Sequence, residues 1–508
     1  MSIVYVDGES LTIKDVIKVS RQDYKIQLTK DTIKKIKQAR KVVDEFVENE
    51  KVVYGITTGF GKFSDVAISK EETKGLQKNL IMSHACGVGN HFHEEISRAI
   101  MLLRINALAK GFSGIRLSTL DTLINMLNKG VHPLIPEKGS LGASGDLAPL
   151  SHMVLVMMGM GEAIYKNEKL TGKEAMERAE IPTIELTSKE GLALINGTQV
   201  MTAVGALTVY DALKLVKMAD ISAAMTLEAL NGITDAFDAR IHAVRPHKGQ
   251  GDCAENILRL TQGSNMTTRQ GEIRVQDAYS LRCTPQIHGG SRDAIDYVLE
   301  KINIEINSVT DNPIIFAQQR DVISGGNFHG QPMALAFDFL GIAIAEIANV
   351  SERRIERLVN PQLSGLPAFL TEKGGLNSGF MIAQYSAAAL VSENKVLAHP
   401  ASVDSIPSSA NQEDHVSMGT IAARKARDIL ENVTNVLAIE ILAASQAIDF
   451  NKNRELGKGT KVAYEIIRKE VSTLHEDRVM YTDINKCSEL IKKHMIIDEV
   501  ENIIGNMN

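Results

Sequence analysis

The segment KGSLGASGDLAPLSHM, residues 138–153, places flexible and reactive residues directly before an apolar stretch. Glycine has no Cβ, so the backbone nitrogen of Gly145 can attack the carbonyl carbon of Ala143, and the flanking glycines permit the compressed backbone that closure demands. Loss of water from that ring and from the Ser144 side chain would leave an exocyclic methylidene, a strong electrophile built from the chain itself. On spacing alone, however, the stretch GSLGASGDL favours a tight turn that lets two backbones pass closely.

The tripeptide stands just ahead of a predicted helix that begins at Asp146, with Pro149 in its first turn. Asn196, Phe328 and Glu413 lie in similar polar stretches ahead of other long apolar segments. Helix N-termini carry unpaired N–H groups and the positive end of the helix dipole, which favour developing negative charge. If these four ends converge, they would form a charged, buried pocket.

Common catalytic and metal motifs do not fit the chain. Residues 142–146 depart from the GxSxG pattern at the last position, and the interval 55–61 is one residue too long for a phosphate-binding loop. His91 and His93 form an HxH pair with no third ligand nearby, which is more typical of a solvated loop than of a metal site. We therefore expect no metal.

Helical patterns dominate the sequence. Apolar residues recur at spacings of three and four in the stripe Ile36, Ala39, Val42, Val43 and Phe46, which indicates an amphipathic helix. The stretches 198–230, 332–359 and 416–450 are rich in alanine, leucine and isoleucine and have no internal proline beyond their first residues, so they predict long helices. Several are apolar nearly all round, which suits a central bundle covered by other helices or other subunits.

The fold class we predict is mainly α, with a long central helical bundle and a smaller N-terminal α+β part, assembled as a helical homo-oligomer. We expect an N-terminal part over residues 1–195, a central bundle over 196–450 and a C-terminal helical appendage over 451–508. Strand patterns are few and occur near residues 2–8, 182–188 and, as a possible hairpin, 312–326.

Charge and cysteine usage exclude several classes of function. The chain has 508 residues, with 56 Lys and Arg against 62 Asp and Glu and no sustained basic block, so nucleic acid and anionic membranes are not expected partners. The cysteines form no CxxC pair and read as reduced cytosolic thiols; they are Cys86, Cys253, Cys283 and Cys487.

Two further patterns bear on location. The most apolar segment, 333–350, contains Asp338 and Glu346, and a central acid costs about 2.5 to 3.5 kcal/mol on membrane-insertion scales, so we expect a buried helix of a soluble protein. Asp7 and Glu9 stand where an export signal would carry basic and apolar residues, so we expect a cytoplasmic protein.

The sequence resembles the ammonia-lyases and aminomutases that carry the prosthetic group 4-methylidene-imidazol-5-one, and within them the histidine ammonia-lyases. The resemblance runs almost the full chain through GSLGASGDLAPLSH, YGITTGFGKF, NLIMSHACGVG, LALINGTQ, VQDAYSLRC, DNPIIF, SGGNFHGQP and VDSIPSSANQEDHVSMG. It implies elimination of ammonia from L-histidine to give trans-urocanate, with the prosthetic group formed from Ala143, Ser144 and Gly145 and no external cofactor. It also implies a homotetramer whose active sites are built from several subunits.

The resemblance also implies roles for single residues, each of which has a structural alternative. Tyr54 would be the base, which requires a pKa well below the usual value of about 10; otherwise it is a packed loop aromatic. Arg282 would hold the substrate carboxylate through its planar guanidinium, or form a surface ion pair. Asn196 would lie beside the prosthetic group, or cap a helix. Asp146 would assist cyclisation, or cap a helix.

Three more positions are implied to line the same site. Gln276 and Tyr279, the latter in a catalytic role, would be satisfied core residues in the alternative interpretation, and Phe328 would pack against the substrate or serve the core.

Substrate choice depends on His84 and Glu413. Phenylalanine and tyrosine enzymes of the family usually carry an aromatic-Leu or His-Leu pair at the position of Ser83-His84, and a glutamine at the position of Glu413. An imidazole needs polar partners, which His84 and Glu413 offer and which a phenyl ring would leave unpaired. The alternatives are a tyrosine or phenylalanine ammonia-lyase or aminomutase, a helical assembly protein with an unmodified tripeptide, and an all-α lyase acting on dicarboxylates.

Overall fold

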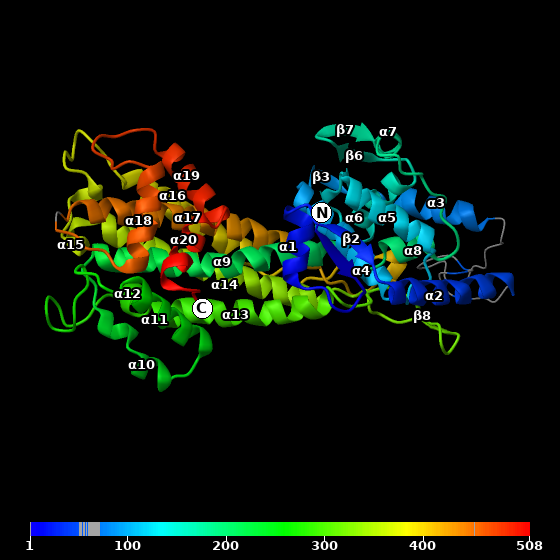
Figure 1. Cartoon of the computed structure of the whole chain (residues 1–508), viewed down its shortest axis with the longest axis horizontal. Coiled ribbons are helices and arrows are strands. Elements are labelled where there is room, and N and C mark those ends of the chain that lie inside the picture. The colour runs from blue at the N-terminus through cyan, green and yellow to red at the C-terminus, as the bar shows by residue number, and fades with distance from the viewer. Residues whose placement is uncertain (1, 50–52, 54–55, 57, 59–71, 452) are drawn as a thin grey trace. The chain divides into compact units, whose positions relative to one another are not determined.

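The computed structural model describes residues 2–49, 53, 56, 58, 72–451 and 453–508. Helices make up most of this part of the chain, and its strands are only three or four residues long. Figure 1 shows helices from the N-terminal to the C-terminal segments, with a few short strands among them. The predicted mainly α fold with a smaller α+β N-terminal part is therefore confirmed, whereas the homo-oligomer stays a prediction.

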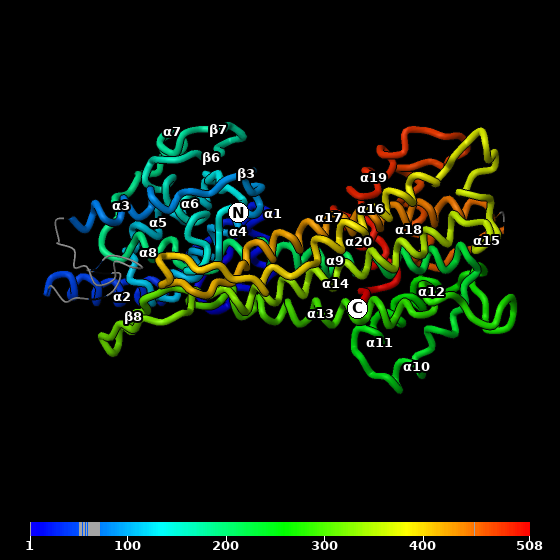
Figure 2. The backbone as a smooth tube through the Cα atoms, turned by 180° about the vertical axis from the view of Figure 1, so that it is seen from behind, coloured from blue at the N-terminus to red at the C-terminus, as the bar shows by residue number. Residues whose placement is uncertain are grey.

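Four helices of more than twenty residues dominate the described part of the chain, and Figure 2 labels each of them along the backbone tube. They are α9 (Gln199–Ala229), α13 (Thr284–Glu305), α14 (Gln331–Val359) and α17 (Gly419–Asp449). Three of them match the predicted long helices, and α13 was not predicted. Close packing uses glycine where two helices meet: a Cβ at Gly205 of α9 would lie 2.0 Å from the ring of Phe337 in α14.

Shorter helices complete the architecture. Those before α9 are α1 (Ile13–Arg21), α2 (Lys30–Glu48), α3 (Thr73–His84), α4 (Glu94–Ala109), α5 (Leu117–Lys129), α6 (Leu147–Met157), α7 (Gly172–Arg178) and α8 (Glu190–Ile195). Those after α9 are α10 (Ala239–Ala243), α11 (Lys248–Leu260), α12 (Tyr279–Arg282), α15 (Pro361–Ser364), α16 (Met381–Leu397), α18 (Lys458–Glu470), α19 (Met480–Lys492) and α20 (Met495–Ile504).

The described strands form four small sheets. β1 (Ile3–Val6) pairs in parallel with β2 (Lys25–Leu28), and the remaining pairs are antiparallel. β3 (Val88–His91) pairs with β5 (Pro136–Lys138), and β8 (Ile314–Phe316) pairs with β9 (Asp321–Ile323). In the three-stranded sheet, β6 (Glu162–Tyr165) lies between β4 (Val131–Pro133) and β7 (Glu168–Thr171). The first strand and the hairpin were predicted correctly.

The strand predicted at residues 182–188 is wrong, because this segment is irregular. Its backbone groups bond outside any ladder: Ile184 N donates to Met157 O at 3.0 Å, and Thr187 N donates to a carboxylate oxygen of Glu190 at 3.0 Å. The alternating pattern that suggested a strand therefore belongs to an irregular segment that is bonded to the end of α6 and leads into α8.

The described chain packs into two compact units, each assembled from three segments. Unit 1 comprises Met1–Leu207, Leu299–Asp338 and Pro400–Arg424, and unit 2 comprises Thr208–Val298, Phe339–His399 and Lys425–Asn508. Each of the four long helices contributes residues to both units. The predicted division into 1–195, 196–450 and 451–508 follows chain order and stays a prediction.

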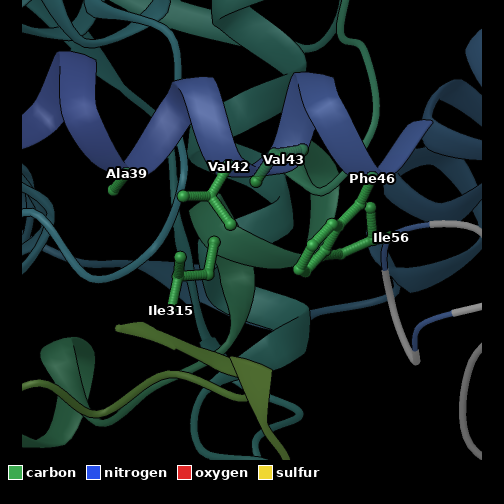
Figure 3. Packing of buried hydrophobic residues seen from close by; sticks show 6 residues of the cluster. All are labelled: Ala39, Val42, Val43, Phe46, Ile56 and Ile315. Carbon is green, nitrogen blue, oxygen red and sulfur yellow. The ribbon is translucent and has the colours of Figure 1, made fainter. Parts of the chain in front are cut away.

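The predicted amphipathic stripe of α2 forms a small core in unit 1. Ala39, Val42, Val43 and Phe46 are all buried and pack with Ile315 of β8 and with Ile56. Figure 3 shows the α2 side chains pointing from one face of the helix toward Ile56 and Ile315. The hairpin is thereby fixed against the N-terminal helices.

α14 is the one helix in the described part of the chain that is long and apolar enough to cross a membrane by length and composition. However, 67% of its most apolar window is buried inside the structure. Its acid Asp338 is also buried and accepts a hydrogen bond from Ser402 N at 2.7 Å. α14 is therefore a core helix, as predicted for this segment.

Candidate active site

The tripeptide lies in unit 1, in the turn that leads into α6, and its glycine is required by the local geometry. Gly145 has a φ of +76°, and a Cβ added there would lie 2.2 Å from the carbonyl oxygen of Gly197. The two glycines form an isolated parallel bridge, and Asp146 N donates to Gly197 O at 2.7 Å. Any larger residue would force apart the tripeptide turn and the start of α9.

Asp146 stands at the start of α6, yet its side chain caps α9. The fully buried carboxylate accepts hydrogen bonds from Val200 N and Met201 N, both at 2.9 Å, in the first turn of α9. It also accepts from Ser140 Oγ at 2.7 Å and from Thr420 Oγ1. Burial raises the pKa of Asp146, although these four hydrogen bonds act in the opposite direction. One carboxylate thus joins the starts of α6, α9 and α17.

The four helix starts expected to converge do meet in unit 1. Asp146 connects three of them, and the fourth, that of α14, lies beside the same residues. A Cβ at Gly330, one residue before α14, would lie 2.6 Å from Met201 Sδ and 3.0 Å from Ser417 Oγ. Ser417 Oγ in turn donates to Gly142 O at 3.1 Å. The positive ends of four helix dipoles therefore surround the tripeptide.

Asn196 contacts the tripeptide directly. Its Nδ2 donates to the carbonyl oxygen of Ser144 at 3.0 Å, while its own carbonyl accepts from Nη1 of Arg104 at 2.7 Å. The residue is buried, and its Oδ1 has no hydrogen-bond partner among the described residues. It does not cap α9, because Asp146 takes that place. Its side chain is thus committed to the tripeptide, with one acceptor left over.

Glu413 holds the side chain of Ser144. Ser144 Oγ donates to Glu413 Oε1 at 3.1 Å, and Ser408 Oγ donates to Glu413 Oε2 at 3.0 Å. Glu413 lies ahead of α17 and is half-buried. A carboxylate therefore stands at the hydroxyl that cyclisation would remove, with its second oxygen fixed by a serine.

His84, the last residue of α3, is half-buried and lies within electrostatic reach of Glu413. Burial lowers its pKa, whereas a hydrogen bond to the Leu80 carbonyl and the negative charge of Glu413 act in the opposite direction. Ser83 Oγ lies 3.0 Å from His84 Nδ1. The structure thus couples His84 electrostatically to Glu413 and keeps its imidazole neutral near pH 7.

The remaining predicted site residues are distributed over other parts of the chain. Gln276, Tyr279 and Arg282 belong to unit 2, where Tyr279 is 69% exposed and the Arg282 guanidinium stacks 4.7 Å from its ring centre. Phe328 is half-buried in the turn before α14 in unit 1. Tyr54 lies outside the described residues. The roles expected of these residues stay predictions.

The structure adds residues that sequence reasoning missed. They are Ser140, Thr420, Ser408 and Arg104, which hold Asp146, Glu413 and Asn196 in place. Only Arg104 carries a signal in the sequence, since it interrupts an apolar helix, α4, that is buried along its length. The serines and the threonine are common residue types in which spacing alone carries no such signal.

One buried cluster in unit 2 has metal-ligand chemistry. The ligand atoms of Asp220, Cys253 and His288 lie within 4.8 Å of one another. They are linked by hydrogen bonds, because Cys253 Sγ and His288 Nδ1 donate to Asp220 Oδ1 at 3.1 and 2.8 Å. Arg292 forms an ion pair with the other oxygen of Asp220. The carboxylate is thus fully engaged by side chains, and we assign the cluster to packing.

The fold and the tripeptide site define a class of enzyme. The family model for aromatic amino acid lyases matches residues 11–469, and the chain belongs to that family. It is 71% identical over 504 residues to histidine ammonia-lyase of Alkaliphilus oremlandii, with 99% of each chain covered, and 66% identical over 496 residues to that of Caldanaerobacter subterraneus, with 98% of each covered.

Solved structures agree with this placement. Histidine ammonia-lyase from Trypanosoma cruzi superposes with a TM-score of 0.92 and 43% identity, covering 99% of this chain and 95% of that one. Tyrosine aminomutase from Streptomyces globisporus gives a TM-score of 0.95 and 40% identity, covering 98% of both chains. The fold alone therefore does not separate elimination from amino-group migration.

The Asp146 contacts predict that this residue controls both stability and cyclisation. Asp146→Ala would leave the first-turn N–H groups of α9 without an acceptor, so we expect the free energy of unfolding to fall by about 2 to 4 kcal/mol. Thermal unfolding measures the change in stability, and intact mass measures the change in cyclisation. Asp238→Ala, which removes a surface cap in unit 2, is the control and should cost about 1 kcal/mol. Equal effects of both variants would contradict this interpretation.

A pH dependence follows from the lowered pKa of His84. Because burial favours the neutral imidazole, the pKa of His84, at which half the rings are protonated, should lie below the ordinary value of about 6.5. We expect kcat/KM to fall on the acid side of its pH profile with a midpoint below that pH. We expect this fall to disappear in His84→Asn. An acid limb above it that depends on His84 would show that the positive form is favoured instead.

Proposed function

We propose that this chain eliminates ammonia from L-histidine without oxidation, giving trans-urocanate, the first step of histidine degradation. The single observation that carries this proposal is the hydrogen bond from Ser144 to Glu413, with His84 electrostatically coupled to the same carboxylate. This contact supports Glu413 and His84 as partners for an imidazole ring beside the tripeptide. Relatives named histidine ammonia-lyase that align over nearly the whole chain support the same activity.

The tripeptide is proposed to become 4-methylidene-imidazol-5-one. The Gly145 nitrogen bonds to the Ala143 carbonyl carbon, and the Ala143 oxygen leaves as water with the hydrogens of the Gly145 and Ser144 nitrogens. A second water carries away the Ser144 hydroxyl and its Cα hydrogen. No external reagent is required, and the mass falls by two waters.

The residues present fit this group. Gly145 occupies a backbone conformation and a space that exclude a Cβ. Asn196 Nδ2 already donates to the Ser144 carbonyl oxygen, where negative charge gathers as the Cα hydrogen leaves. Glu413 holds the hydroxyl that departs, and its carboxylate oxygen is then released to meet a substrate. When formed, the group supplies an electrophilic carbon to which the substrate amine adds, so that ammonia can leave.

His84 and Glu413 are proposed to bind the imidazole ring. A neutral imidazole and a carboxylate satisfy the ring nitrogens of histidine, and the same groups would be left unpaired by a phenyl ring. Phe328 is proposed to pack against the substrate or the cyclised tripeptide. Ser83 and Ser408 hold the two polar groups in place through the contacts described above.

Tyr54 is proposed as the base that takes the β-proton. A tyrosine has an ordinary pKa near 10, so this role requires a positive environment that favours the phenolate. The four converging helix N-termini offer such an environment around the tripeptide. Tyr54→Phe should therefore retain cyclisation while losing the elimination step.

The substrate carboxylate is assigned to Arg282, and Gln276 and Tyr279 are assigned to the same end of the substrate. A guanidinium offers the two-pronged geometry that a carboxylate prefers. We propose that these unit 2 residues complete the site within a homotetramer, in which several copies of the chain build each active site. We also propose that the enzyme is cytoplasmic.

Product analysis tests the proposal. The purified protein is incubated with L-histidine, and the mixture is followed by proton NMR together with an ammonia assay. We expect trans-urocanate and ammonia in equal amounts. Formation of a β-amino acid would identify an aminomutase, as in structural relatives of that name. Unchanged histidine with a fully cyclised tripeptide would overturn the substrate assignment.

A further inference from the structure

Two arginines of α4 are buried, but they are held very differently. Arg98 donates through Nε and Nη2 to Val19 O at 2.9 and 2.7 Å, and its Nη1 lies 3.0 Å from a His132 nitrogen. Arg104 is completely buried, yet only its Nη1 has a partner, the carbonyl oxygen of Asn196 at 2.7 Å. Its Nε and Nη2 have no hydrogen-bond partner among the described residues.

A guanidinium with unpaired N–H groups is costly to bury. Burial lowers the pKa of Arg104 to about 10, and the charges of Asp311 and Asp146 act in the opposite direction. Asp311 is itself paired with Lys189 at 2.8 Å, and Asp146 is committed to the helix starts. The group remains positive near pH 7 without a carboxylate of its own. Packing alone does not explain a cation retained at this place.

The position of Arg104 offers an explanation. Its one hydrogen bond falls on the peptide of Asn196, whose side chain reaches the Ser144 carbonyl oxygen at 3.0 Å. That oxygen gathers negative charge when Ser144 loses its Cα hydrogen as a proton, because the electron pair left on Cα is shared with the adjacent carbonyl. By holding the Asn196 carbonyl, Arg104 fixes the residue whose amide donates to that oxygen and so stabilises the anion.

We propose that Arg104 is a positioning residue for the electrophile: it fixes the Asn196 peptide so that the Asn196 amide points at the Ser144 carbonyl oxygen. This inference rests on the proposed function. It acts on the formation of the group, so it predicts a defect that is visible before any substrate is added.

The side chains that can replace Arg104 separate charge from shape. Arg104→Lys keeps a positive charge and a single donor nitrogen on a flexible stem, whereas Arg104→Met keeps an unbranched stem and removes both. If Arg104 acts through Asn196, removing both residues should be no worse than removing Asn196 alone. The buried Arg98 of the same helix provides the matched control, since its partners lie away from the tripeptide.

The experiment compares Arg104→Lys, Arg104→Met, Asn196→Ala, the Arg104→Met/Asn196→Ala pair and Arg98→Met. Intact mass gives the fraction of each purified chain that has lost two waters, and thermal unfolding gives its stability. We expect the fraction of chains that has lost two waters to fall about tenfold or more in Arg104→Met and by less in Arg104→Lys. Arg98→Met should lose stability while keeping full water loss.

Three results would overturn the inference. The first is complete water loss in both Arg104 variants. The second is a decrease in water loss in Arg98→Met equal to that in Arg104→Met. The third is a double variant in which clearly fewer chains have lost two waters than in Asn196→Ala. Should Arg104→Met fail to fold, Arg104→Lys compared with Arg98→Lys decides, because slower water loss in Arg104→Lys alone supports the inference and wild-type behaviour contradicts it. A wild-type chain that loses no water would instead refute the proposed function, so the two failures are distinguishable.

Discussion

Ser144→Ala should abolish both the loss of two waters and the activity. Alanine has no hydroxyl to eliminate, so the methylidene cannot form even where the ring closes. The turn should survive, because the contacts that shape it come from Gly145, Asp146 and Gly197 and do not use the Ser144 hydroxyl. We expect kcat for L-histidine to fall by at least about 10³-fold, with the thermal unfolding midpoint unchanged within a few degrees.

Ser151→Ala is the matched control for this variant. Ser151 is also buried, lies in α6 just beyond the tripeptide, and donates only to Leu147 O within its own helix. Its replacement should leave both mass loss and turnover at wild-type levels. Turnover of Ser144→Ala near the wild-type rate would show that the reaction does not use this tripeptide.

Glu413→Gln should remove the preference for an imidazole ring. The substitution keeps the shape but loses the negative charge, and charge-assisted hydrogen bonds contribute about 1.5 to 3 kcal/mol. We therefore expect kcat/KM for L-histidine to fall by about 10- to 100-fold. Discrimination against L-phenylalanine and L-tyrosine should narrow by a similar factor, as measured with each amino acid separately.

The adjacent exposed acid gives the control for the charge itself. Asp414→Asn removes the same formal charge one residue away, at an exposed position, and should change kcat/KM by less than about twofold. If both variants lowered kcat/KM for L-histidine equally, the effect would come from the total negative charge of the loop. The carboxylate of Glu413 would then not be the ring partner.

Sequence patterns predicted the elements that carry the site better than they predicted its connections. The long helices and the glycine-rich turn followed from apolar composition and from residues with known backbone preferences. The side chain of Asp146 caps α9, whose first turn is more than fifty residues away in the chain, rather than the helix that it begins. Spacing cannot reveal that partner, because tertiary packing brings the two helix starts together.

The errors have similar physical causes. Helix α13 mixes polar and apolar residues without a strong stripe, so its length was not apparent from composition. Residues 182–188 alternate like a strand, but helix-start and side-chain contacts use their backbone groups. Arg104 was passed over because an arginine in an apolar helix identifies a buried cation without identifying its function.

The most direct test of the central claim is the growth of ultraviolet absorbance when the purified chain is mixed separately with L-histidine, L-tyrosine and L-phenylalanine. The account predicts growth with L-histidine alone, and its loss in Ser144→Ala. Growth with tyrosine or phenylalanine in place of histidine would contradict the roles given to His84 and Glu413. No growth with any of the three would contradict the lyase activity itself.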